Sequence, residues 1–168
     1  MGLARTVFLA TTDSDGLMTD PKRSLFEVST DELGSWMVER GHRPYHARQV
    51  FRWVFERRVE AFEGMSDVPL RLREELAAEW SIFSTTVATH LVAPDGTDKL
   101  LLECRDGRRV ECVLMAEEDR RTVCISTQVG CGMGCVFCAS GLKGVERNLT
   151  WGEIVEQVVR LRNLLPPE

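Results

Sequence analysis

The sequence predicts an α+β fold, and three stretches of the chain support this prediction. Residues 29–80 carry apolar side chains at helical spacing, with capping residues near the expected helix ends. Residues 84–115 alternate short apolar runs with Asp-Gly turns, a pattern typical of antiparallel hairpins. Residues 121–163 then follow the order strand, long loop, helix. We therefore expect a helical N-terminal part, a small antiparallel sheet and the beginning of a β/α arrangement.

Composition sets the broad class of the protein. The 168 residues are enough for one domain or two small ones, and the apolar fraction of 43% is ordinary for a globular chain. No apolar run is long enough to span a membrane and no secretion signal is evident, so we expect a cytoplasmic protein whose six cysteines are reduced. The net charge of −5 does not indicate nucleic-acid binding, so any RNA contact must come from a local basic patch.

The N-terminal half divides into an irregular stretch and a helical one. Residues 1–28 mix Gly, Asp, Thr and Ser without periodicity, and we expect a poorly ordered extension. Ser29 and Glu32 have the spacing of a capping box, and Gly41 suits the position after a helix end. Proline near each start and apolar spacing predict the other two helices. The helices of this accessory domain, residues 29–82, are expected over 29–41, 44–59 and 66–80.

A locally basic segment runs from residue 40 to residue 58 and contains six arginines but a single acidic residue, Glu56. Arg48 and Arg52 are four residues apart and share a helix face, with Arg43 just before the helix. These three side chains are candidates for contacts with RNA phosphates. A solvated helix face without a ligand explains the same pattern equally well.

Strands are expected next, over residues 84–93, 98–104 and 108–115. For the second hairpin, a two-residue loop would pair Glu103 with Val110 and scatter the apolar side chains over both faces. A three-residue loop, with Gly107 in the left-handed conformation, gathers six side chains on one face instead. Those side chains are Leu100, Leu102, Cys104, Val110, Cys112 and Leu114. We favour this register, which turns Glu111 to the opposite face.

The last part of the chain, residues 83–168, combines these hairpins with a strand–loop–helix unit. A strand is expected over 121–127 and a charged connector over 143–148. Thr150 and Glu153 then have the spacing of a capping box at the start of a final helix. In this order, a functional loop follows the carboxyl end of its strand.

Three cysteines within eight residues form the most informative motif: Cys131, Cys135 and Cys138. Thiolates select iron–sulfur clusters, zinc or copper(I), and three of them leave a four-iron cluster with one open iron. Gly132 and Gly134 allow the backbone to wrap closely around a cluster, and Phe137 is expected to screen it from water. The alternative is a structural zinc site closed by a fourth ligand, although zinc sites more often use pairs of cysteines separated by two residues.

The spacing C-x3-C-x-aromatic-C resembles the signature of radical S-adenosylmethionine (SAM) enzymes, and further motifs resemble one family among them. Those motifs are Asp106-Gly-Arg-Arg-Val-Glu111, the run from Arg121 to Cys131, Cys135-Val-Phe-Cys138 and Arg147-Asn-Leu149. Together with the segments 41–53 and 65–69 they resemble the RlmN/Cfr family over roughly residues 30–163. Members of this family methylate adenine in 23S ribosomal RNA, at C2 in the RlmN branch and at C8 in the Cfr branch, and RlmN members also act on some transfer RNAs.

The resemblance implies a role for each matching residue. Cys131, Cys135 and Cys138 would hold a 4Fe–4S cluster that binds SAM. The cluster would lie in a partial β/α barrel and would be reduced by flavodoxin or ferredoxin. Glu111 would accept a proton from the substrate, and Cys124 would help to release the RNA from a covalent intermediate. From the residues alone, Glu111 fits an ordinary exposed strand residue and Cys124 a small buried one.

One expected element of that chemistry is absent from these residues. Family members carry the transferred methyl group on a cysteine near their C-terminus, and here the last cysteine is Cys138. We therefore expect these 168 residues to represent only the N-terminal portion of the barrel enzyme and to be inactive alone. The alternatives are a non-catalytic RNA-binding accessory module and a zinc-binding structural protein.

Overall fold

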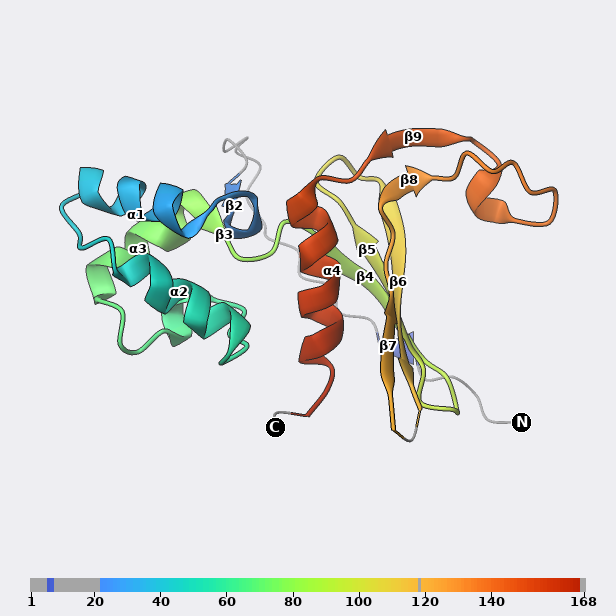
Figure 1. Ribbon diagram of the computed structural model, residues 1–168, viewed down its shortest axis with the longest axis horizontal. Helices are drawn as coiled ribbons and strands as arrows, with labels where there is room; N and C mark the ends of the chain where they lie inside the picture. Colours follow the sequence, from blue (N-terminus) through green and yellow to red (C-terminus); the bar gives the residue numbers. More distant parts are fainter. Residues whose placement is uncertain (1–5, 8–21, 118, 167–168) are drawn as a thin grey trace. The chain divides into compact units, whose positions relative to one another are not determined.

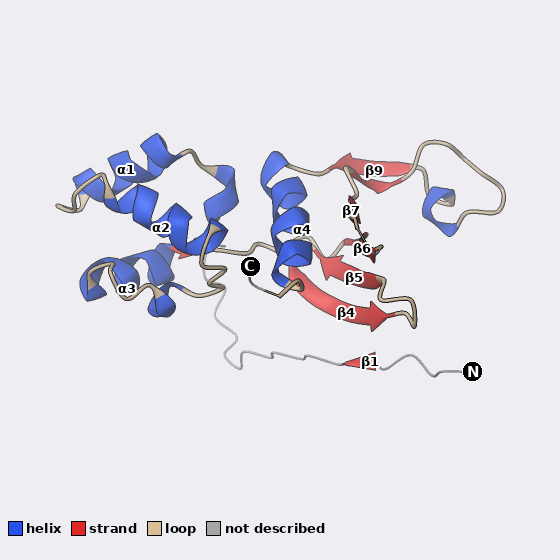
Figure 2. Cartoon of the chain, turned by 60° about the horizontal axis from the view of Figure 1, so that its bottom comes forward, coloured by secondary structure: helices blue, strands red, loops and turns tan. Residues whose placement is uncertain are grey.

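The computed structural model describes residues 6–7, 22–117 and 119–166. The chain forms two compact units: the first ends at Ser84, and the second contains residues 6–7 together with the chain from Thr85 onward. Helices make up most of the first unit, whereas the second combines antiparallel strands with one long helix (Figures 1 and 2). This mixture of helices and small sheets agrees with the predicted α+β class.

The helical unit is built from three helices closed by a short strand pair. Its elements are β2 (Arg23–Ser24), α1 (Thr30–Glu39), α2 (His46–Phe55), α3 (Leu70–Glu79) and β3 (Trp80–Ser81). Because β2 and β3 pair in parallel, the two ends of this unit are joined. The expected poorly ordered extension is wrong for residues 22–28, since Leu25 and Phe26 lie fully within the core. Burial of these two apolar side chains stabilises an ordered structure, which the Gly- and Ser-rich composition of the whole stretch did not indicate. The rest of that extension, apart from residues 6–7, lies outside the described residues.

Helix α1 has both of the ends that the sequence predicted. The Ser29 hydroxyl accepts a hydrogen bond from the Glu32 backbone N–H at 3.2 Å, and the Glu32 carboxylate accepts one from the Ser29 N–H at 2.8 Å. At the other end Gly41 has φ +79°, and the His42 N–H bonds to the carbonyl of Met37 at 2.9 Å. These local bonds fix the helix length at ten residues.

The other two helices are shorter than predicted. The residues predicted at the ends of α2 and at the start of α3 lie outside these helices. Pro69, predicted in the first turn of α3, is its N-cap residue. At the start of α3 Leu70 is 62% exposed, whereas Leu72 and Leu76 are fully buried. Only some of the apolar side chains of α3 therefore face the core.

The second unit is organised around a five-stranded sheet in the order β1-β4-β5-β6-β7. Its elements are β1 (Thr6–Val7), β4 (Thr86–Val92), β5 (Asp98–Glu103), β6 (Arg109–Ala116), β7 (Arg121–Cys124), β8 (Gln128–Gly130), β9 (Val145–Asn148) and α4 (Trp151–Asn163). The described strand pairs of this sheet are all antiparallel. Strand β7 lies at its edge beside β6, so the predicted hairpins and the predicted strand–loop–helix unit share one sheet.

The register of the β5–β6 hairpin is the one that the three-residue loop predicts. Leu100 lies opposite Cys112 and Leu102 opposite Val110, and Gly107 has φ +75°. The six side chains expected on one face are all buried, and α4 covers them with Leu161, Ile154 and other apolar residues (Figure 1). The capping box of α4, formed by Thr150 and Glu153, is also as predicted. One face of the sheet is thus a packed core, and the other is left open.

The segment before α4 differs from the prediction. The strand expected over 121–127 ends at Cys124, and residues 145–148, expected as a charged connector, form β9 paired with β8. The cysteine loop lies at the tip of this hairpin, at the end away from α4 in both views (Figures 1 and 2). Sequence periodicity missed β9 because its side chains are mostly charged or polar, so its pairing rests on backbone hydrogen bonds rather than on an alternating apolar face.

Candidate functional site

Glu111 and Cys124 lie on the open face of the sheet. Cys124 is opposite Val113 in the β6–β7 pair, and Glu111 is two residues from Val113 on β6. Because side chains alternate between faces along a strand, both groups point to the same side. Both are exposed, so Cys124 is not the small buried residue that its apolar neighbours suggested. A carboxylate and a thiol are therefore presented together, away from the α4 core.

A lysine that the sequence reasoning missed stands beside this carboxylate. The Lys99 ammonium is 3.0 Å from the Glu111 carboxylate, and Lys99 is opposite Val113 in the β5–β6 pair. Lys99, Val113 and Cys124 therefore form one row across three strands, with Glu111 diagonal to the lysine. Only the register brings these residues together, because they are far apart in sequence.

The cysteine loop is fixed at its base by a close approach of two backbone segments. Gly130 has φ +79°, and a Cβ atom at this position would lie 2.1 Å from the carbonyl oxygen of Gly144. The Cys131 N–H donates a hydrogen bond to the same carbonyl at 3.1 Å. Only glycine fits at position 130, for both steric and conformational reasons. Of the two glycines inside the loop, Gly134 has a left-handed φ of +62°, whereas a Cβ on Gly132 would meet Val145 at 3.3 Å.

The three cysteines of the loop are free and partly exposed. A backbone hydrogen bond of 3.1 Å from Cys138 to Cys135 places these two in one turn. Within the part of the chain that the structure describes, no three Cys, His, Asp or Glu side chains are grouped closely enough to hold a metal ion. The donor chemistry nevertheless fits an iron–sulfur cluster, because three accessible thiols occupy one loop whose glycines leave room for it. The expectation that Phe137 shields this loop is wrong here, since its side chain is 89% exposed.

A hollow of about 830 Å³ connects the open face of the sheet with the cysteine loop. Glu111 and Cys124 line it from the sheet, and Ser140, Leu142 and Lys143 line it from the loop. The three cysteines lie in the same loop but do not line the hollow itself. The Glu111 carboxylate, the Cys124 thiol and the Lys143 ammonium group therefore belong to residues that line one space, which is large enough for a nucleobase.

Arg147 joins the base of the cysteine loop to two other elements. From β9, its guanidinium donates two hydrogen bonds of 2.8 Å to Glu153 at the start of α4 and one of 2.6 Å to Asp106 in the β5–β6 turn. These bonds lower the pKa of both carboxyl groups and raise the pKa of Arg147. The sequence contained this residue in a recognisable motif but gave no sign of its partners.

Gln157 holds the chain just after Cys124. Its side-chain oxygen accepts from the Ser126 N–H at 2.9 Å, and its amide donates to the Ser126 carbonyl at 2.9 Å. The Ser126 hydroxyl in turn donates to the backbone carbonyl of Glu111 at 2.8 Å. The fully buried Gln157 side chain thus satisfies the backbone of Ser126 as a neighbouring strand would, and it fixes the segment just after Cys124.

The other two cysteines are core residues, as the sequence suggested. Burial, with a further contribution from nearby Glu153, raises the pKa of the Cys104 thiol to about 12. Burial raises the pKa of the Cys112 thiol to about 11. Neither has appreciable thiolate near neutral pH, so neither is a candidate nucleophile or metal ligand.

In the helical unit, the three candidate RNA-binding arginines are all exposed: Arg43, Arg48 and Arg52. Arg48 and Arg52 are one turn apart on α2, and Arg52 has only a distant ion pair, at 3.8 Å, with Glu56. The histidines are engaged elsewhere, His42 with Glu75 at 2.8 Å and His46 with Gln49 at 2.5 Å. These arginines therefore keep charge available for a ligand.

Comparison with known proteins connects both units to one family. Residues 23–82 match the ribosomal RNA large subunit methyltransferase N-terminal domain, RlmN_N. A protein named probable dual-specificity RNA methyltransferase RlmN, from Rhodopirellula baltica, is 48% identical over 161 residues, which are 95% of this chain. This chain corresponds to the N-terminal portion of RlmN proteins. The RlmN protein of Bacillus subtilis, with the same name, is 42% identical over 142 residues, or 84% of this chain.

A solved structure in the same comparison extends the likeness to the fold. The crystal structure of a radical SAM methyltransferase from Sphaerobacter thermophilus matches with a TM-score of 0.77 and 39% identity over 83% of this chain. The chain spans about two fifths of the length of these proteins: 43% of the Rhodopirellula RlmN, 39% of the Bacillus RlmN and 41% of the Sphaerobacter enzyme. Among the described residues, no helix has the length and apolar character needed to cross a membrane.

Proposed function

We propose that this chain forms the RNA-binding and cluster-binding portion of a cytoplasmic radical SAM methyltransferase that modifies adenine C2 in 23S ribosomal RNA, and in some transfer RNAs. The observation that best supports this proposal is that Glu111 and Cys124 share the open face of the sheet and line the same hollow as the cysteine loop. The names of the RlmN relatives support RNA as the class of substrate. Completion of a partial β/α barrel around this face is part of the same proposal.

In this mechanism Cys131, Cys135 and Cys138 would hold a 4Fe–4S cluster at which SAM binds. When bound and reduced by a flavodoxin or ferredoxin, the cluster would supply one-electron reductive cleavage of SAM. Adenine C2 is not nucleophilic, so the family route passes through a methylated cysteine that is not among these 168 residues. Gly130 and Arg147 hold the loop that carries the three thiols.

The remaining steps fall to two side chains on the open face. The Glu111 carboxylate takes the proton from adenine C2 after the new carbon–carbon bond has formed and the adduct radical has returned one electron to the electron carrier. The Cys124 thiolate then attacks the sulfur that links the RNA to the enzyme, so that a disulfide forms and the carbon–sulfur bond breaks. The electron pair of that bond stays with the carbon attached to the base, which takes up a proton and becomes the methyl group. Lys99, 3.0 Å from Glu111, orients this carboxylate on the open face. Exposure of both groups supports these roles, because a base and a nucleophile must reach the substrate.

Anaerobic reconstitution of the full chain with iron and sulfide tests the cluster assignment. We expect about four irons per chain and a broad visible absorption. Cys131→Ala, Cys135→Ala and Cys138→Ala should each lose the absorption, whereas Cys112→Ala, a matched change at a buried cysteine, should keep it. Tight binding of colourless zinc by four protein donors would overturn the assignment and favour a structural zinc protein.

RNA binding is tested separately. Titration of the chain with a fragment of 23S ribosomal RNA should give an affinity that falls with salt. Arg48→Ala and Arg52→Ala should each make the negative slope of log affinity against log salt shallower by roughly one. Binding that depends on these arginines in a chain that takes up no iron would instead favour the non-catalytic RNA-binding module.

A further inference from the structure

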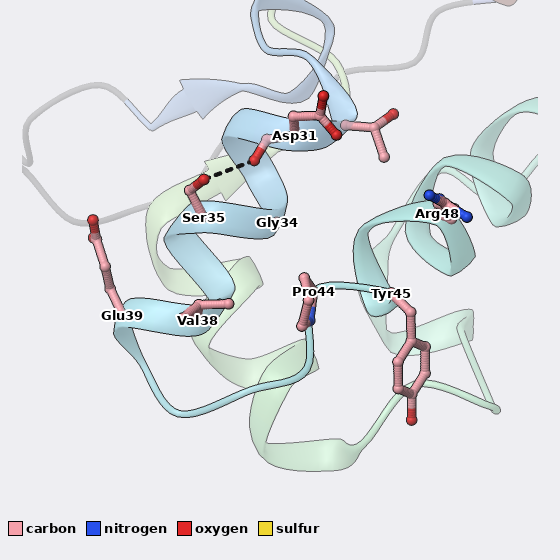
Figure 3. Close-up of a pocket in the computed structure, with 9 residues that line it drawn as sticks. Asp31, Gly34, Ser35, Val38, Glu39, Pro44, Tyr45 and Arg48 are labelled. Atoms are coloured by element: carbon pink, nitrogen blue, oxygen red, sulfur yellow. Dashed lines mark hydrogen bonds between the residues drawn. The ribbon is translucent and has the colours of Figure 1, made fainter.

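A groove of about 660 Å³ lies between α1 and α2 of the helical unit, and the candidate RNA-binding residue Arg48 is part of its lining. Figure 3 shows its two walls, with Asp31 and Glu39 on α1 and with Tyr45 and Arg48 at the start of α2. Gly34, which has no side chain, forms the floor with Pro44. The groove thus has an apolar floor and one aromatic wall, with charged groups at its rim.

Tyr45 is the most informative residue of this groove. It is the only tyrosine of the chain and is 56% exposed. Its ring centroid is 4.3 Å from that of His46, which is buried and bonded to Gln49 at 2.5 Å. One side of the phenol ring is therefore supported by a fixed neighbour, while much of its surface faces solvent. A rigid, exposed aromatic ring is the usual platform for stacking an unpaired base.

Arg48 supplies a cation at the same wall. Its backbone N–H donates to the Tyr45 carbonyl at 3.1 Å, so both residues belong to the first turn of one helix. Within the described residues the Arg48 side chain has no ion-pair partner, unlike Arg40, whose guanidinium is 2.8 Å from the Glu79 carboxylate. Asp31 on α1 repels phosphate but can accept hydrogen bonds from the amino group of a base or from a ribose hydroxyl (Figure 3). This charge arrangement directs the phosphate to one wall and the base to the groove.

We propose that the groove binds one unpaired RNA nucleotide, with its base stacked on Tyr45 and its phosphate against Arg48. This inference rests on the proposed function, because it takes RNA as the ligand of the helical unit. It adds a preference for single-stranded RNA, since bases inside a duplex cannot reach an aromatic ring. Any base can stack on a phenol ring, so the groove selects unpaired structure rather than sequence.

Fluorescence anisotropy with a 12-nucleotide oligoadenylate and a blunt RNA duplex of the same length tests this site. Tyr45→Ala should weaken oligoadenylate binding by roughly 5- to 100-fold, the range for one lost stacked base, and leave duplex binding unchanged. Tyr45→Phe keeps the ring and should change affinity by less than about twofold. Arg48→Ala should make the negative slope of log affinity for oligoadenylate against log salt shallower by about 0.7. Arg71→Ala, a change at an exposed arginine of α3, should leave this slope unchanged.

Because the chain has a single tyrosine, 3-fluorotyrosine labelling gives one ¹⁹F resonance that reports on the groove directly. We expect oligoadenylate, but not the duplex, to shift this resonance. Binding that responds to Arg48→Ala but not to Tyr45→Ala would overturn the stacking site and leave RNA binding intact. Failure of both RNAs to bind would overturn both proposals. A shift that depends only on protein concentration would assign the groove to a second copy of the chain.

Discussion

The two faces of one sheet show how the same strands produce inert and accessible side chains. On the face under α4, Cys104 and Cys112 are buried and the pKa of each thiol is raised. On the opposite face Glu111 and Cys124 are exposed at the rim of a large hollow. Since neighbouring residues alternate between the faces, a difference of one position decides whether a cysteine is a core residue or a candidate nucleophile.

Removing bulk from the two faces should have unequal effects. Leu102 is fully buried, so Leu102→Ala should lower the free energy of unfolding by about 2 to 5 kcal/mol. Leu101→Ala, the same change at the next residue and on the open face, should cost about 1 kcal/mol. Urea denaturation followed by circular dichroism measures both. Equal losses would contradict the assignment of one packed and one open face.

Thiol labelling compares the faces chemically. In a chain with Cys131, Cys135 and Cys138 changed to Ser, three of the six cysteines remain. At pH 8, iodoacetamide should modify Cys124 in the native protein, while Cys104 and Cys112 react about a hundredfold more slowly until urea unfolds the chain. Mass spectrometry of the peptides identifies each site. Rapid native labelling of Cys112 would show that the α4 side is not closed.

Substitution of Arg147 tests how firmly the base of the cysteine loop is joined to α4 and to the β5–β6 turn. Arg147→Ala removes four hydrogen bonds, three of them to carboxylates, and should lower the free energy of unfolding by about 1 to 3 kcal/mol at pH 7. Arg120→Ala, an exposed arginine paired with Glu117, should cost less than about 0.5 kcal/mol and serves as the control.

The same variant has a defined pH dependence. The pKa values of Asp106 and Glu153 are lower in the folded chain than in the unfolded one, chiefly through hydrogen bonds from Arg147. Their contribution is therefore complete above the ordinary carboxyl pKa of about 4 and is lost as the pH falls through the folded values. The difference between wild type and Arg147→Ala should shrink between pH 5 and about pH 2 in urea titrations. A difference that stays constant would argue against this network.

The smallest expected effect concerns the turn that sets the register of the two faces. Gly107 has φ +75°, and a Cβ atom at this position would meet none of the described residues within 4 Å. Gly107→Ala should therefore cost only the backbone strain, about 1 kcal/mol. Gly107→Asn should cost less, because asparagine tolerates this conformation. Thermal unfolding measures both. A loss much larger than about 1 kcal/mol for Gly107→Ala would indicate that the register itself had shifted.

Local sequence signals predicted those parts of the fold that local bonds determine. Ser29 with Glu32 and Thr150 with Glu153 form their capping boxes within four residues, and Gly107 fixes its hairpin in the same way. Strand β9 and the burial of Leu25 escaped prediction because each depends on a partner distant in sequence. The motif residues of the candidate site were recognisable one by one, but their roles stay predictions.

By itself the sequence determined the α+β class, the register of one hairpin and the three clustered thiols, because spacing and capping act over a few residues. Tertiary structure alone decided that Glu111, Lys99 and Cys124 meet on one face, that Arg147 holds the base of the cysteine loop, and that Tyr45 stands exposed beside a groove. The physical reason is the pairing of strands and packing of helices, which bring together residues whose separation along the chain carries no signal of contact.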